Sequence, residues 1–134
     1  MNALMYNDAL GKLILRLTLG GLMLLHGIAK INKPGTVDYI GNVLSDVGFP
    51  SALAYGVYIG EIIAPLMIIL GVYSRIAGLI IVVNMIFAIL LMHSGDIFSL
   101  TKHGGWAIEL QAFYLLCGAA VMFLGSGRHA VKPD

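Results

Sequence analysis

Ionisable side chains interrupt the apolar segments of this sequence, and these are the groups that could do chemistry. The stretch Tyr58 to Leu70 reads YIGEIIAPLMIIL, and the carboxylate of Glu61 lies in its middle. An ionisable group within a bilayer costs about 3 kcal/mol or more unless it faces the protein interior and finds a partner. Glu61 therefore predicts a polar site or a polar contact inside the molecule.

Helical spacing brings further polar groups to the same end of the molecule as Glu61. His26 and Lys30 are four residues apart, so they lie on one face of a helix. Glu109 opens the last apolar segment, and His93 ends the third. If successive segments alternate in direction, one half of the molecule collects groups from every segment. We predict a polar pocket formed by His26, Lys30, Glu61 and Glu109, with walls from Tyr55, Tyr58, Trp106 and Phe113.

Two interpretations of these buried groups remain open. A carboxylate beside a histidine can exchange protons, because burial and a neighbouring charge move the pKa of each group. Alternatively, the polar groups only hold the helices in register. Arg16 and Glu61 are the candidates for such a structural ion pair, reached by the long arginine side chain.

Other kinds of site find little support. Neither HxxxH nor HExxH occurs, so we expect no metal. A haem held by His26 and His93 has no further support, and we do not expect one. The single cysteine, Cys117, excludes a disulfide within the chain. A net charge of +1 and the lack of a basic patch argue against a nucleic-acid partner.

The elements that must position these residues are membrane helices. The chain is 59% hydrophobic and 11% charged, with a mean hydropathy of +0.92, whereas soluble domains carry about 25% charged residues. A helix needs about 20 apolar residues to cross the hydrocarbon core, and backbone groups in lipid must be bonded internally. We predict one all-α domain, residues 1–134, that is a bundle of four transmembrane helices at about 10–30, 52–73, 75–93 and 105–125.

The connection between the first two of these helices is expected to hold a short amphipathic helix at the membrane surface. Pro34-Gly35 indicates a turn, and apolar residues follow at helical spacing until Gly48 and Pro50: Val37, Ile40, Val43, Leu44 and Val47. The lysines and arginines favour cytoplasmic termini. One side carries Lys12, Arg16, Arg75, Arg128 and Lys132, and the other Lys30, Lys33 and Lys102.

The order of these features resembles the DoxX family of small four-helix membrane proteins. The similar stretches are LILRLTLGGLMLLHGIAKI, YIGNVLSDVGFPSALAY, GEIIAPLMIILGVYSRIAGL and ELQAFYLLCGAAVMFLGSGR. The most specific positions are Arg16, Gly27 with Lys30, Gly60 with Glu61, and Gly71 with Arg75. After the terminal glycines, Arg128 and His129 replace the serine and aspartate common in the family.

The resemblance implies a membrane subunit linked to redox metabolism, in the bacterial cytoplasmic (inner) membrane. The family is named after a subunit of a thiosulfate:quinone oxidoreductase. Two hypotheses therefore stay open, and with them whether the chain is catalytic. In the first, quinone binds in the polar pocket of a redox subunit. In the second, a non-catalytic protein binds a partner protein through the loop Ile31 to Ser51, and the buried charges only stabilise the fold as structural locks. Either hypothesis is compatible with a partner subunit or a homo-oligomer.

Overall fold

The computed structural model describes residues 3–134, of which 75% are helical. The longer helices are α1 (Asp8–Asn32), α2 (Gly35–Asp46), α5 (Ser74–Met92) and α6 (Glu109–Leu124). The shorter ones are η1 (Ala3–Tyr6), η2 (Ser51–Tyr55), α3 (Gly56–Tyr58), η3 (Ile59–Ile63), α4 (Ala64–Leu70) and η4 (Ser94–Asp96). Residues 3–134 contain isolated β-bridges and no strand, so the all-α prediction is confirmed.

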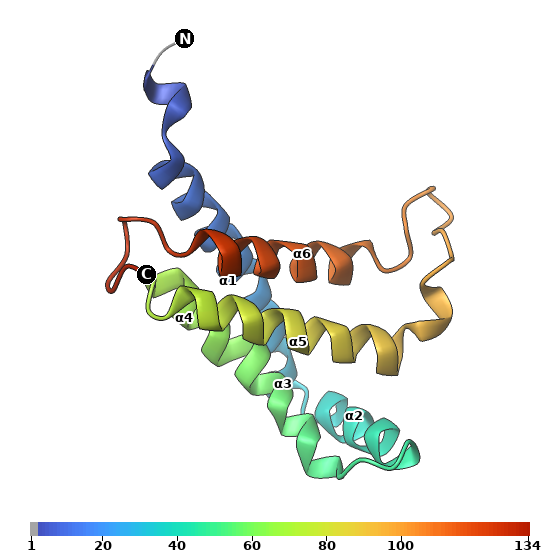
Figure 1. Ribbon diagram of the computed structural model, residues 1–134. Coiled ribbons are helices and arrows are strands. Elements are labelled where there is room, and N and C mark those ends of the chain that lie inside the picture. The colour runs from blue at the N-terminus through green and yellow to red at the C-terminus, as the bar shows by residue number, and fades with distance from the viewer. Residues whose placement is uncertain (1–2) are drawn as a thin grey trace.

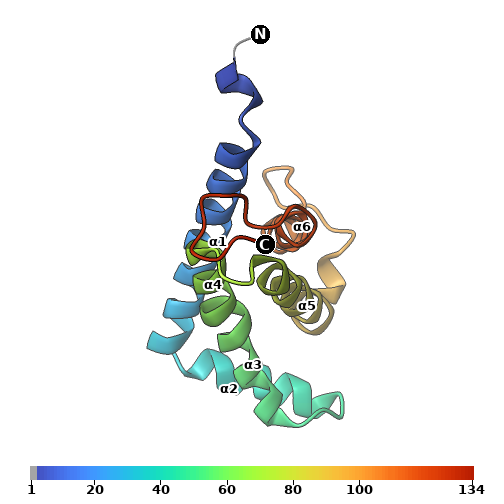
Figure 2. The same ribbon diagram turned by 60° about the vertical axis from the view of Figure 1, so that its left-hand side comes forward.

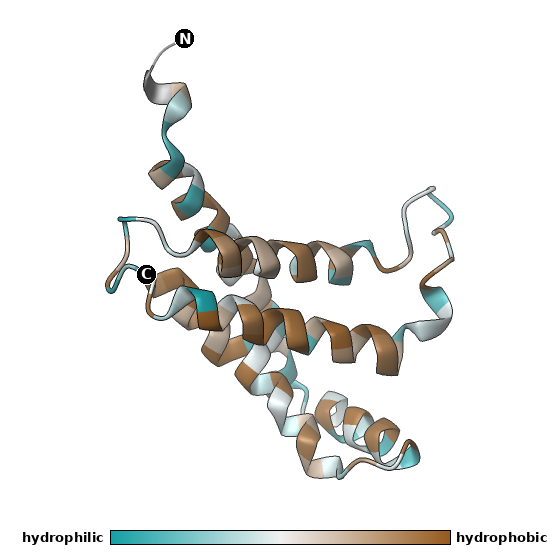
Figure 3. Cartoon of the chain, viewed as in Figure 1, coloured by the Kyte–Doolittle hydropathy of each residue, from teal (hydrophilic) through white to brown (hydrophobic). Residues whose placement is uncertain are grey.

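Three stretches are long and apolar enough to cross a membrane: Asp8–Asn32, Ser51–Leu70 and Ser74–Met92. The second of them is continuous from η2 through α4. The last apolar helix, α6, has only 16 residues, so the predicted count of four spanning helices is not established. Figure 3 shows that apolar residues cover α4, α5 and α6, as a lipid-facing surface requires. The protein is an integral membrane protein.

Two helix pairs make up the body of the molecule. α5 and α6 lie side by side and share the most extensive contact, and α1 packs along α4 (Figure 1). Figure 2 looks nearly along α5 and α6 while α1 stands upright, so the two pairs cross steeply. Glycines permit the close packing of α5 against α6, because a Cβ on Gly78 would lie 2.5 Å from the carbonyl oxygen of Gly118.

The second stretch changes its helical geometry around Pro65. Proline has no N–H, so the carbonyl of Glu61 loses the donor that an α-helix would supply four residues later. The residues before Pro65 form the π-helical turn η3, in which the N–H of Ala64 bonds to the carbonyl of Ile59, five residues back. The regular helix α4 then begins with Pro65 in its first turn, where a missing N–H costs little.

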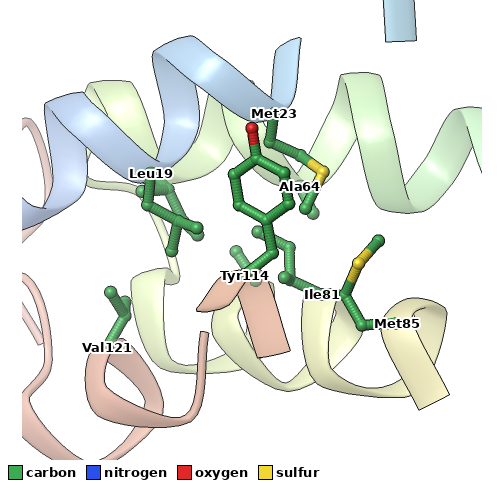
Figure 4. Close-up of a cluster of buried hydrophobic side chains, with 9 residues drawn as sticks. Leu19, Met23, Ala64, Ile81, Met85, Tyr114 and Val121 are labelled. Carbon is green, nitrogen blue, oxygen red and sulfur yellow. The ribbon is translucent and has the colours of Figure 1, made fainter. Parts of the chain in front are cut away.

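The apolar core lies where the two pairs cross. Side chains from α1, α4, α5 and α6 meet there, among them Leu19, Met23, Ala64, Ile81, Met85, Tyr114 and Val121 (Figure 4). A second, smaller cluster joins α2 to the start of the second stretch, through Val37, Leu44 and Ala54. The predicted amphipathic helix is present as α2, which thus packs against the protein with its apolar face.

Candidate functional site: a polar pair in an apolar cavity

A cavity of about 600 Å³ lies between the helices, beside the main core. Its walls are mostly aliphatic side chains from α1, α2, η3, α5 and α6. Eight polar or ionisable residues also line it: His26, Lys30, Thr36, Glu61, Asn84, His93, Gln111 and Tyr114. A volume of this size suits a small organic molecule, and such sites are typically apolar with a few convergent polar groups.

Lys30 and Glu61 form the most tightly paired polar group in the cavity wall. The Nζ atom of Lys30 lies 2.6 Å from Oε1 of Glu61, and their side chains are 21% and 6% exposed. Lys30 comes from the last turns of α1, and Glu61 from the π turn η3. Because neither charge is well hydrated, the pair is held by direct contact rather than by solvent.

His26 lies one turn before Lys30 and packs against an aromatic ring of α6. The rings of His26 and Tyr114 meet edge to face, with centroids 5.6 Å apart and planes at 82°. The Tyr114 side chain crosses the core from α6, and its hydroxyl points toward α1 (Figure 4). Both residues line the cavity, and Tyr114 also belongs to the apolar core, so this contact lies where the cavity borders the core.

A second polar group lies where α5 ends. The Nδ1 atom of His93 is 3.5 Å from a carboxylate oxygen of Asp96, and its Nε2 atom is 3.4 Å from Nε2 of Gln111. His93 and Gln111 line the cavity, whereas Asp96 is exposed. Sequence reasoning did not include Gln111 in the pocket. Its spacing from Glu109, two residues along a helix, correctly places the two side chains on different faces.

The structure brings together three of the four predicted pocket residues. Glu109 is exposed at the start of α6 and does not line the cavity; its carboxylate lies beside Gly105. Glu109 was expected in the pocket because it begins the last apolar helix at the end of the molecule where Lys30 and His93 also lie. That position, however, faces away from the other helices.

The predicted aromatic walls lie outside the cavity lining. Tyr55 and Phe113 are 61% and 63% exposed, and Tyr58 donates a long hydrogen bond of 3.5 Å to the carbonyl of Lys30. Trp106 is held in its own loop, where its Nε1 donates to the carbonyl of Ile97 at 2.5 Å. Aliphatic residues of α5 and η3 form the walls in their place.

The predicted ion pair between Arg16 and Glu61 is not formed, and this corrects the sequence analysis. Arg16 is 1% exposed, and its guanidinium donates to four backbone carbonyls. These belong to Ile68 (3.0 Å), Ile69 (3.1 Å), Ser126 (2.9 Å) and His129 (2.7 Å). The first two lie at the end of α4, about two helical turns beyond Glu61, so Arg16 meets α4 at a different level.

The C-terminal tail, residues 125–134, folds back over this end of the molecule. Arg75 donates to the carbonyls of Met122 and Phe123 at the end of α6, and Asp134 accepts from the backbone N–H groups of Arg75 and Ser126. The N–H of Val131 bonds to the carbonyl of Leu70. The last carbonyls of a helix have no partner within it, and here Arg75, which precedes them by more than forty residues, supplies the donors.

The profile of the DoxX family matches residues 11–94, more than half of the chain. The chain belongs to the DoxX family. The match includes Lys30, Glu61 and both tail-binding arginines, whereas α6 and the tail lie beyond it.

Two curated proteins are similar to this DoxX protein. A Haemophilus influenzae protein named "Uncharacterized protein" is 32% identical over 120 residues, which cover 87% of this chain and 84% of the relative. A Bacillus subtilis protein named "Putative oxidoreductase CatD" is 30% identical over 82 residues, covering 60% of this chain and 58% of the relative. No solved structure matches the chain significantly.

The cavity of this DoxX protein combines hydrogen-bond donors with proton-exchanging groups. Lys30 can donate to an oxygen atom, and Glu61 and His26 can accept or release protons. Within residues 3–134, three or more histidine, cysteine, aspartate or glutamate side chains do not gather into a metal-binding group. The arrangement suits an organic ligand with a polar head and an apolar body.

Proposed function

We propose that this DoxX protein serves redox metabolism and binds a quinone in its cavity. The observation that carries the proposal is the buried Lys30–Glu61 pair in the wall of a largely apolar cavity. Membership of the DoxX family and the name of the oxidoreductase relative also support it.

The chemistry of a quinone matches the side chains that line the cavity. A quinone is a lipid-soluble ring whose carbonyl oxygens accept hydrogen bonds and whose reduction consumes protons as well as electrons. The Lys30 ammonium would donate to a carbonyl oxygen, while Glu61 and His26 would hold and exchange protons. The electrons would come from a partner protein, so the chain would act as a subunit.

The test is quinone binding by a Glu61→Gln variant in detergent or nanodiscs. We expect the variant to lose quinone binding, because the amide neither takes up a proton nor holds the Lys30 ammonium by charge. Glu109→Gln is the matched control, since that carboxylate is exposed and outside the cavity. An unchanged affinity of Glu61→Gln for quinone would count decisively against the proposal.

We further propose that α6 is a fourth spanning helix and that both termini lie in the cytoplasm of a bacterium, with the protein in the inner membrane. The 16 residues of α6 span about 24 Å at the usual rise of 1.5 Å per residue. The hydrocarbon core is about 30 Å thick, so the residues flanking α6 must complete the crossing. The excess of lysine and arginine on the side of the termini supports this orientation.

A further inference from the structure

Part of the cavity wall is also part of the outer surface of the protein. Ile59, Val83 and Phe87 all line the cavity, and yet they are 48%, 45% and 47% exposed. Val83 lies at the midpoint of α5, and Ile59 lies within the spanning stretch Ser51–Leu70. Residues that both line a cavity and remain exposed form the rim of an opening, and these three form the part of the rim that lies on η3 and α5. This rim therefore lies at the depth of the lipid hydrocarbon.

The line along which α3 and η3 of the second stretch face α5 is called the seam between η3 and α5. Two glycines of the second stretch, Gly56 and Gly60, leave few side chains along this seam. Gly56 and Gly60 are four residues apart, so they occupy nearly the same face of the second stretch. A Cβ on Gly56 would meet nothing within 4 Å, so there is open space beside it. A Cβ on Gly60 would lie only 2.5 Å from Cγ of Asn84, so at that point the asparagine side chain closes the seam.

Asn84 is a polar residue at this opening, because its side chain lies against Gly60. Its side chain is half-buried and lines the cavity, and within residues 3–134 it has no hydrogen-bond partner. Leaving the donors and the acceptor of an amide unpaired in an apolar environment is unfavourable. A ligand passing between Gly60 and α5 would meet the Asn84 amide, and the Lys30–Glu61 pair lines the same cavity.

We propose that the seam between η3 and α5 is a lateral portal through which a membrane-borne amphipathic molecule enters the cavity. Its hydrocarbon chain lies between Ile59, Val83 and Phe87, and its polar end reaches Asn84 and the Lys30–Glu61 pair. An apolar chain passes such a rim without entering water, which would cost about 0.8 kcal/mol for each CH₂ group. Only the identification of this molecule as a quinone rests on the function proposed above.

The test uses a phospholipid with a photoreactive diazirine in its acyl chain, in nanodiscs that contain the full chain. After illumination, mass spectrometry maps the labelled residues. We expect labels on Met85 and Ala88, which line the cavity and are buried or half-buried, as well as on outward-facing residues. Val83→Trp should fill the rim and lower the labelling of Met85 and Ala88 about tenfold. This corresponds to a free energy of lipid entry that is about 1.4 kcal/mol less favourable.

Ile86→Trp is the matched control. Ile86 lies on the same helix and is 41% exposed, but it does not line the cavity. This variant should leave the labelling of Met85 and Ala88 unchanged. The portal is refuted if wild-type labels stay on outward residues such as Ile86 and Leu90, or if Val83→Trp leaves the inner labels unaltered.

A competition measurement separates the portal from the proposed quinone. A long-tailed ubiquinone analogue added before illumination should reduce the labels on Met85 and Ala88. If the analogue leaves these labels unchanged while Val83→Trp removes them, the portal stands and the quinone proposal fails.

Discussion

Arg16 and Glu61 are both buried among apolar side chains, and each is stabilised by a different kind of partner. Glu61 pairs with one ammonium group, while the planar guanidinium of Arg16 bonds to four carbonyls. Two of these carbonyls belong to the end of α4 and two to the C-terminal tail. Arg16 therefore joins segments that are more than fifty residues apart along the chain.

Replacing Arg16 tests this contact at the level of one residue. Arg16→Lys keeps the charge, but an ammonium cannot serve four carbonyls in different directions. We expect the free energy of unfolding in mild detergent to fall by about 3 kcal/mol, because buried acceptors lose their donors.

Arg128→Lys is the control for that measurement, because Arg128 is exposed on the same tail. Its effect should stay within about 0.5 kcal/mol, as for most surface substitutions. Equal stabilities of the two variants would show that the Arg16 contacts contribute nothing.

At the scale of elements, the contact between α1 and η3 depends on one glycine. A Cβ on Gly27 would collide with the carbonyl oxygen of Glu61, so the two segments approach each other closely only because that side chain is missing. The same approach brings Lys30, one turn further along α1, within reach of Glu61. The helix contact and the ion pair thus have one structural cause.

Gly27→Ala should separate α1 from η3. We expect it to reduce the free energy of unfolding by about 2 kcal/mol, within the usual range for overpacking, and to weaken quinone binding, because the Lys30–Glu61 pair moves apart. Chemical unfolding and quinone titration check these two effects.

Gly21→Ala, on the same helix, is the matched control. A Cβ there meets nothing within 4 Å, and alanine favours a helix by up to about 1 kcal/mol over glycine. Its stability should therefore be unchanged or higher. If Gly27→Ala behaves in the same way, the close approach of the backbone is not needed for the fold.

At the scale of the whole molecule, α2 and the tail cover opposite ends of the crossed helix pairs. α2 packs through Val37 and Leu44 on η2 and lines the cavity with Ile40. The loop that was expected to present a surface to a partner protein therefore also forms a wall of the cavity. Partner binding by this loop remains a prediction.

The proposed orientation has a direct test. In a Cys117→Ala background, Lys102→Cys should react in intact cells with a maleimide that cannot cross the membrane, because its loop faces outward. Arg128→Cys, in the tail, should react only after the cells are opened. The reverse pattern would invert the topology, and labelling of both in intact cells would mean that α6 does not separate the two positions.

Composition and hydropathy alone are enough to predict a helical membrane protein. Sparse charge and apolar runs require helices in a bilayer, because a lipid environment leaves the backbone no external partner. The spacing of His26 and Lys30 and the depth of Glu61 also predicted that these three residues lie close together, and all three line the cavity. These properties are local: they depend on composition and on helical periodicity, both of which can be read along one segment.

The pairing of the polar groups, in contrast, depends on contacts between distant segments. The choice of Lys30 rather than Arg16 as the partner of Glu61 depends on how far α1 slides along the second stretch, and Gly27 and the π turn before Pro65 set that distance. The exclusion of Glu109 depends on the rotation of α6, and the sites of Arg16 and Arg75 depend on the folded tail. Packing between distant segments fixes these relations, and helical spacing within a segment carries no information about them.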